Sequence, residues 1–108
     1  MVDFDPVRGS EAAKRRPAVI VSNEQANKTA QRLGRGVLTV VPITSNVDRV
    51  YPFQVLLPAG TAGLRTDSKA QAEQVRAVSV GRIGEPIGKL PDTIIASIDQ
   101  ALRLHLAV

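Results

Sequence analysis

Short apolar runs separated by proline, glycine and small polar residues follow one another along this chain, and helical periodicity is clear only near its end. We expect a stub strand at 2–5 and further strands at 17–22, 37–44, 51–57, within 68–80 and at 86–89. The polar segment 23–35 is expected to be a loop that contains at most a helical turn. This order predicts a mainly β fold, a small curled sheet or barrel followed by one helix.

The run at 51–57 has the clearest alternation of the chain. Tyr51, Phe53, Val55 and Leu57 would lie on one face of the strand, because successive side chains point to opposite faces. Pro52 cannot donate a hydrogen bond to a neighbouring strand, so this strand is expected to start at an edge of the sheet.

The final segment, 91–106, has the spacing of an amphipathic helix. Pro91 suits the first position of a helix, and Asp92 would lie at the positive end of the helix dipole. At helical spacing, one apolar stripe consists of Ile94, Ile95, Ile98, Ala101 and Leu102. The stripe predicts a helix that covers the barrel or a partner subunit.

The composition is that of one small folded domain. With 108 residues, of which 44% are hydrophobic, the chain can bury one core, and we treat 1–108 as a single domain. It has no Cys and no signal segment, and no apolar run approaches the roughly 20 residues of a membrane-spanning helix, so we expect a cytoplasmic protein without a membrane partner. A net charge of +4 suits a polyanion such as RNA or an acidic peptide, although solubility alone explains the same charge.

Few residues are available for catalysis. The one His, His105, falls in the stripe of the predicted helix, so we expect a partly buried structural imidazole and exclude a two-histidine ribonuclease. The acidic residues are scattered rather than grouped at metal-ligand spacing, and neither a P-loop nor a dinucleotide fingerprint is present. What remains is the cationic segment Lys14-Arg15-Arg16 before Pro17, with hydroxyls at Ser10 and at Thr44-Ser45.

Five blocks along the chain resemble, in order, the signature blocks of the MazF/PemK toxins of type II toxin–antitoxin systems. They are Asp3-Phe4-Asp5-Pro6, Gly9-Ser10-Glu11, Arg15-Arg16-Pro17-Ala18-Val19, Val41-Pro42-Ile43-Thr44-Ser45 and Glu73-Gln74-Val75-Arg76. The resemblance implies a small SH3-like barrel of the CcdB/MazF type with a C-terminal α-helix, a homodimer and no cofactor. It also implies an mRNA interferase, an endoribonuclease that cleaves single-stranded RNA at specific sequences without a metal, leaving 2′,3′-cyclic phosphate and 5′-hydroxyl ends. The first part of that family's N-terminal strand is missing from this chain.

Carried over by motif, the catalytic residues implied are Arg16 and Thr44, with Ser10 and Glu11 beside them. Arg16 can offer several donors to the phosphate as negative charge develops on it. A free guanidinium keeps its proton far above neutral pH, so we expect charge stabilisation rather than proton abstraction. Thr44 would donate to a phosphoryl oxygen, and Glu11 would orient Arg16 or act as a base. Without the blocks, Arg16 reads as a solvated loop charge and Thr44 as a strand-end cap.

RNA contacts are expected from polar groups near the groove, because single-stranded RNA exposes the edges of its bases to them. The residues expected to bind RNA are Arg15, Lys14, Ser45, Asn46, Ser68, Gln74 and Arg76. Only Phe4, Tyr51 and Phe53 are aromatic, so a continuous stacking platform for nonspecific RNA coating is not available.

The resemblance also implies a cognate antitoxin, whose acidic flexible tail would occupy the RNA groove. Two other functions stay open. A CcdB-like inhibitor of DNA gyrase would share the fold, but that family ends with a Trp and this chain has none. A noncatalytic barrel that binds an antitoxin is the other alternative.

Overall fold

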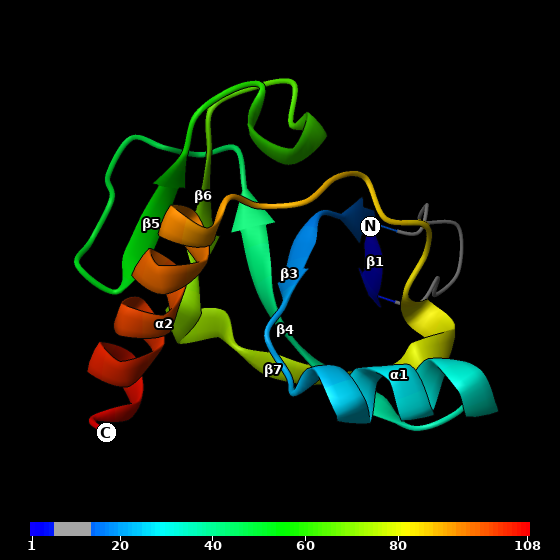
Figure 1. Cartoon of the computed structure of the whole chain (residues 1–108). Helices are drawn as coiled ribbons and strands as arrows, with labels where there is room; N and C mark the ends of the chain where they lie inside the picture. Colours follow the sequence, from blue (N-terminus) through cyan, green and yellow to red (C-terminus); the bar gives the residue numbers. More distant parts are fainter. Residues whose placement is uncertain (6–13) are drawn as a thin grey trace.

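The structure, a computed structural model, describes residues 1–5 and 14–108 and contains a curved antiparallel sheet with two helices (Figure 1). Its strands are β1 (Val2–Asp5), β2 (Lys14–Arg16), β3 (Ala18–Ile20), β4 (Val37–Thr44), β5 (Gln54–Leu57), β6 (Ser68–Gln71) and β7 (Arg76–Ser79). The helices are α1 (Glu24–Leu33) and α2 (Asp92–Leu106), with short 3-10 turns η1 (Thr61–Gly63), η2 (Ala72–Gln74) and η3 (Val80–Arg82). The prediction of a mainly β fold that ends in a helix is confirmed. Among the described residues, no helix is long and apolar enough to cross a membrane.

The longest strand, β4, organises the main sheet. One of its edges pairs with β3, where Val19 is opposite Val41. The other edge pairs with β7 over residues 37–40 and then with β6 at Ile43 and Thr44. Because β6 and β7 share this edge with η2 between them, the sheet bends there. The ladders of the described strands follow an open path, β3-β4-β6-β5 with β7 on β4, and do not close into a ring.

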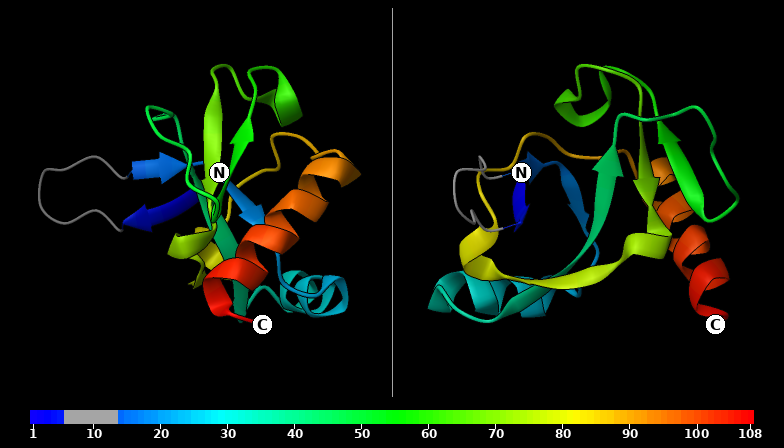
Figure 2. Two further views of the ribbon diagram at one scale, coloured as in Figure 1. Left: turned by 90° about the vertical axis from the view of Figure 1, so that its left-hand side faces the viewer. Right: turned by 180° about the vertical axis from the view of Figure 1, so that it is seen from behind.

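A separate two-stranded sheet is formed by β1 and β2, in which Val2 is paired with Arg16. Figure 2 shows this pair extending away from the main sheet at one side of the molecule. Pro17, between β2 and β3, has no N–H to donate and interrupts the strand. Its carbonyl accepts the N–H of Ile43 at 3.0 Å. This hydrogen bond holds the end of β2 beside the end of β4.

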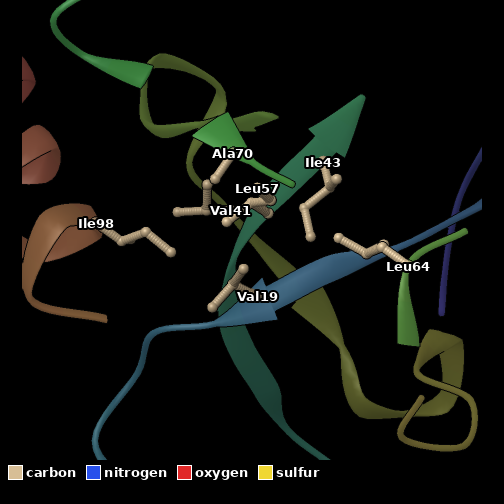
Figure 3. Close-up of a cluster of buried hydrophobic side chains, with 7 residues drawn as sticks. All are labelled: Val19, Val41, Ile43, Leu57, Leu64, Ala70 and Ile98. Atoms are coloured by element: carbon tan, nitrogen blue, oxygen red, sulfur yellow. The ribbon is translucent and has the colours of Figure 1, made fainter. Parts of the chain in front are cut away.

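The main core lies between the sheet and α2. Its buried members are Val19, Val41, Ile43, Leu57, Leu64, Ala70 and Ile98. Figure 3 shows Ile98 reaching from α2 toward Val41 and Val19 on the sheet. A smaller cluster contains Val2, Val40 and Val78. Since the side chains of Val40 and Val41 point to opposite faces of β4, this strand contributes to both clusters and is buried on both sides.

α2 begins one residue after Pro91, the predicted first helical residue, and its last turns are more exposed than predicted. Pro91 is the N-cap residue, and its carbonyl accepts the N–H of Ile94 at 3.0 Å. The predicted apolar stripe divides into buried, half-buried and exposed members, which are Ile98 and Ala101, Ile94 and Leu102, and Ile95 respectively. The prediction of a partly buried His105 is wrong, because the side chain is exposed. The helix continues past Ala101, its last buried residue, so the turn that carries His105 has no sheet beneath it.

The segment 23–35 was predicted to be a loop. This prediction is wrong, because the segment contains the three-turn helix α1. The Asn23 side chain accepts the N–H groups of Gln25 and Ala26 at 2.8 and 3.2 Å and caps the helix start. At the other end, Gly34 adopts φ 66° and donates to the carbonyls of the last turn. Among the helix residues whose burial is described, only Ala30 is buried. The helix was missed because the apolar residues on its one stripe are few and mostly small, namely Ala26, Ala30 and Leu33.

The strand predicted at 51–57 is shorter than expected, because its first residues form a turn before β5. Tyr51 and Phe53 do not line a core face; their rings stack on each other with centroids 5.4 Å apart. Gln54 is buried instead, since its side chain accepts from the Tyr51 N–H at 3.1 Å and donates to Glu73 at 2.6 Å. A satisfied polar side chain therefore replaces an apolar one in this position.

No strand forms at 86–89, which belongs to the connection from η3 to α2. This connection runs against η1, where the two backbones are in direct contact. A Cβ atom on Gly63 would collide with the Ile87 carbonyl, and one on Gly88 would collide with the backbone of Ala62. Both positions therefore require glycine. The region 68–80 does form two strands, β6 and β7, as predicted.

Candidate active site

A hollow of about 860 Å³ lies where the ends of β2 and β4 meet the start of β6 and the η1 region. Its polar lining consists of arginine and hydroxyl side chains, namely Arg15, Arg16, Arg65, Thr44, Ser45, Thr66 and Ser68. The remaining lining residues are Met1, Pro17, Ile43, Gly63, Leu64 and Ile87. Residues that are far apart in the sequence thus share one concave surface, which we call the arginine hollow.

Arg15 and Arg16 reach the arginine hollow from β2. Both are exposed, and the proline that follows them forces the chain out of the strand. The Pro17 carbonyl is hydrogen-bonded to the N–H of Ile43. Arg16, which precedes Pro17, is therefore held close to Thr44, which follows Ile43. A guanidinium in this place can offer parallel donors to a phosphate bound in the hollow.

Thr44 is the last residue of β4, at the point where the chain turns into the loop 45–53. Its hydroxyl oxygen accepts the N–H of Asn46 at 3.3 Å, and the Asn46 side chain accepts the N–H of Asp48 at 3.2 Å. The hydroxyl proton of Thr44 is not used in either bond, so it can be donated to a bound oxyanion. Thr44 also acts as the strand-end cap that its position suggested.

The third wall comes from the chain between η1 and β6. Ser68 is buried, and its hydroxyl donates to the Thr66 carbonyl at 3.0 Å, so this side chain offers a ligand only acceptor capacity. Arg65 is exposed and was not among the predicted residues. It lies in a turn-rich segment outside the five sequence blocks, and an isolated cation between turn residues carries no spacing signal. Asp67 accepts the N–H of Ala59 at 2.8 Å and fixes this segment.

Several predicted site residues lie elsewhere. Asn46 follows Ser45 in the loop but does not line the hollow. Gln74 lies in η2, and Arg76 is paired with Val40 on β4, roughly 13 Å along the strand from Thr44. Lys14 is the first residue of β2. Ser10 and Glu11 lie outside the described residues.

The lining gives the hollow a positive field. Arg15, Arg16 and Arg65 face it, and no Asp or Glu occurs among its described lining residues. Like charges on a concave surface raise the local concentration of an oppositely charged ligand. The arrangement can therefore bind a phosphodiester, and its hydroxyl and guanidinium donors can stabilise added charge on that group.

Comparison with known proteins assigns the chain to a protein family. The chain belongs to the PemK-like, MazF-like toxins of type II toxin–antitoxin systems, whose family model matches residues 1–106. Endoribonuclease MazF9 of Mycobacterium tuberculosis is 61% identical over 97% of this chain and 89% of its own length. Endoribonuclease EndoA of Bacillus subtilis is 29% identical over 98% of this chain and 88% of its own length.

A solved structure supports the same assignment. The MazE–MazF crystal structure (Form-II) from Deinococcus radiodurans contains a chain that superimposes with a TM-score of 0.79 and is 28% identical. The match covers 99% of this chain and 89% of that one. The predicted membership in the MazF/PemK family is thus confirmed, and the names of the relatives support the predicted endoribonuclease activity.

Proposed function

We propose that this toxin cleaves single-stranded RNA in the arginine hollow at short specific sequences, without a metal ion. The observation that carries the proposal is the shared lining of Arg16 and Thr44, the two residues that the sequence blocks single out, together with Arg15 and Arg65. A cationic hollow with hydroxyl donors suits a phosphodiester better than a neutral or cationic substrate. The relatives named as endoribonucleases support RNA as the substrate that contains this phosphodiester.

In the proposed reaction, the ribose 2′-oxygen attacks the adjacent phosphorus and the bond to the 5′-oxygen breaks. The products are a 2′,3′-cyclic phosphate and a 5′-hydroxyl, so the proton lost by the nucleophile is balanced by one gained by the leaving oxygen. Arg16 stabilises charge on the phosphoryl oxygens, and Thr44 donates one more hydrogen bond to them. Glu11 would orient Arg16 or accept the proton, and Ser10 would lie beside it. No metal is needed to supply the charge.

Recognition of bases is proposed to start from Ser45, which lines the hollow, and from the adjacent Asn46. Ser68 contributes acceptor capacity at the opposite wall. Gln74 and Arg76 would contact nucleotides further along the strand, because they are outside the hollow. Lys14 is also proposed to bind RNA. Tyr51 and Phe53 stack on each other, which leaves single-stranded RNA to be held by its phosphates and base edges.

Two protein partners complete the proposal. The toxin acts as a cytoplasmic homodimer, and a cognate antitoxin neutralises it by laying an acidic, flexible tail across the arginine hollow. The described lining supports this choice, since a carboxylate-rich peptide would pair with the same arginines as RNA does. The Deinococcus radiodurans relative was crystallised as a MazE–MazF complex.

Purified protein incubated with a mixed-sequence single-stranded RNA in EDTA tests the proposal. We expect cuts at a few short sequences and 5′-hydroxyl ends, and we expect Arg16→Ala to lower cleavage by about 10²-fold or more with an unchanged melt. Arg32→Ala is the matched control, because Arg32 is an exposed arginine on α1 outside the hollow.

Intact RNA in the presence of folded protein would falsify the enzyme. If antitoxin binding persisted in that case, the noncatalytic barrel would be correct. Stoichiometric inhibition of gyrase supercoiling would instead revive the CcdB-like alternative, which the MazF-type relatives do not favour.

A further inference from the structure

Lys69 is a buried lysine on β6 that the proposed reaction does not use. Only 7% of the residue is exposed, although lysine is almost never buried without a partner. Its ammonium donates to the main-chain carbonyl of Arg49 at 2.6 Å and lies 6.0 Å from the centre of the Tyr51 ring. Both contacts belong to the loop 45–53. The buried charge is thus directed at the backbone of a surface loop.

A second buried polar side chain, Gln54, holds the same loop at Tyr51. Gln54 accepts the Tyr51 N–H through its side chain and donates to the Tyr51 carbonyl through its own N–H at 2.8 Å. Its amide nitrogen is anchored in turn on the Glu73 carboxylate at 2.6 Å. The loop is therefore held by two buried polar side chains, which come from β5 and β6.

The anchors lead directly to the arginine hollow. Lys69 is the cross-strand partner of Thr44 in the β4–β6 ladder. The residue that it holds, Arg49, follows Asp48, whose N–H is bound by Asn46; the Asn46 N–H is bound in turn by the Thr44 hydroxyl. A shift of the Arg49 backbone would move this turn, and with it Ser45 and the direction of the Thr44 hydroxyl.

We infer that Lys69 is a positioning residue that fixes the loop 45–53 beside the arginine hollow and thereby sets which bases are accepted next to the scissile phosphate. It does not touch RNA, since it is buried. This inference rests on the proposed ribonuclease function. A fixed loop offers base-recognition groups in one arrangement, and this rejects bases that would leave those groups unpaired.

The test compares Lys69→Met with Lys89→Met, which alters an exposed lysine in the connection to α2. Methionine keeps most of the buried volume of lysine but has no N–H donor. We expect Lys69→Met to reduce the ratio of kcat/KM between the best-cleaved sequence and its single-base variants by about tenfold. Hydrogen exchange of the amides of Asn46, Asp48 and Tyr51 should accelerate in this variant and not in the control.

A merely structural lysine would lower cleavage of all sequences together and leave their ratio unchanged, which would overturn the inference. If wild type cleaves no RNA, the proposed function fails, while the exchange measurement still decides whether Lys69 holds the loop. If Lys69→Met does not fold, Lys69→Gln decides: its amide side chain is one bond shorter and loses the 2.6 Å contact to the Arg49 carbonyl, and an unchanged sequence ratio would refute the positioning role.

Discussion

The proposed catalytic role of Thr44 depends on the orientation of its hydroxyl group. The Thr44 oxygen already accepts the Asn46 N–H at 3.3 Å, so one of its lone pairs is occupied from inside the chain. This bond restricts where the remaining proton can point and favours donation to a ligand. In the proposed reaction, the turn that caps β4 would orient the hydroxyl before RNA binds.

Thr44→Val tests this role because valine has the same shape and lacks the hydroxyl. We expect kcat/KM for RNA cleavage to fall by about 10²-fold, the usual effect of removing one donor to a charged transition state. Thr44→Ser keeps the oxygen and should retain most of the activity. Equal cleavage by the valine variant and wild type would remove Thr44 from the reaction, and thermal melts of all three proteins would exclude a folding effect.

Among the secondary structure elements, strands with a continuous apolar run could be predicted, whereas elements fixed by polar side chains could not. The apolar run of β4 forms a strand as predicted, from Val37 to the neighbourhood of Thr44. α1 was missed because it has few large apolar residues to pack against the sheet, although Asn23 and Gly34 are ordinary end signals of a helix. The pattern of 51–57 was misread because burial of Gln54 depends on Glu73, which is distant in the sequence.

The N-cap of α1 carries a prediction of its own. Asn23→Ala removes the acceptor for the N–H groups of Gln25 and Ala26, and the free energy of unfolding should fall by about 1 kcal/mol. Gln25→Ala alters an exposed side chain in the same turn and should be nearly neutral. Urea titration of both variants measures the difference. An Asn23→Ala loss no larger than that of the control would mean that α1 does not need its cap.

At the scale of the whole molecule, the fold depends on one helix covering one face of a bent sheet. Ile98 is the α2 residue among the buried members of the main core, and its side chain points toward Val41 and Val19 of the sheet (Figure 3). The arginine hollow belongs to this scale too. Its polar side chains come from three distant segments. Motifs identified the first two and Ser68 was predicted in the third, whereas Arg65 became visible only when the chain was folded.

Ile98→Ala should lower the free energy of unfolding by about 3 kcal/mol, a large share of the roughly 5–15 kcal/mol that holds a small domain folded. Leu104→Ala, on the same helix but 57% exposed, should change it by no more than about 0.5 kcal/mol. Chemical denaturation followed by circular dichroism gives both values. Similar losses for the two variants would show that α2 is not attached to the sheet through Ile98.

The backbone contact between η1 and the connection to α2 makes these two segments a single mechanical unit. Where side chains lie between two adjacent segments, a change of rotamer can accommodate a shift of one segment. The main chains are in direct contact between Gly63 and Ile87 and between Ala62 and Gly88, so no side chain can accommodate such a shift there. A ligand that displaced residues 87–88 would therefore also displace the neighbouring wall that carries Leu64 and Arg65, and would change the shape of the arginine hollow.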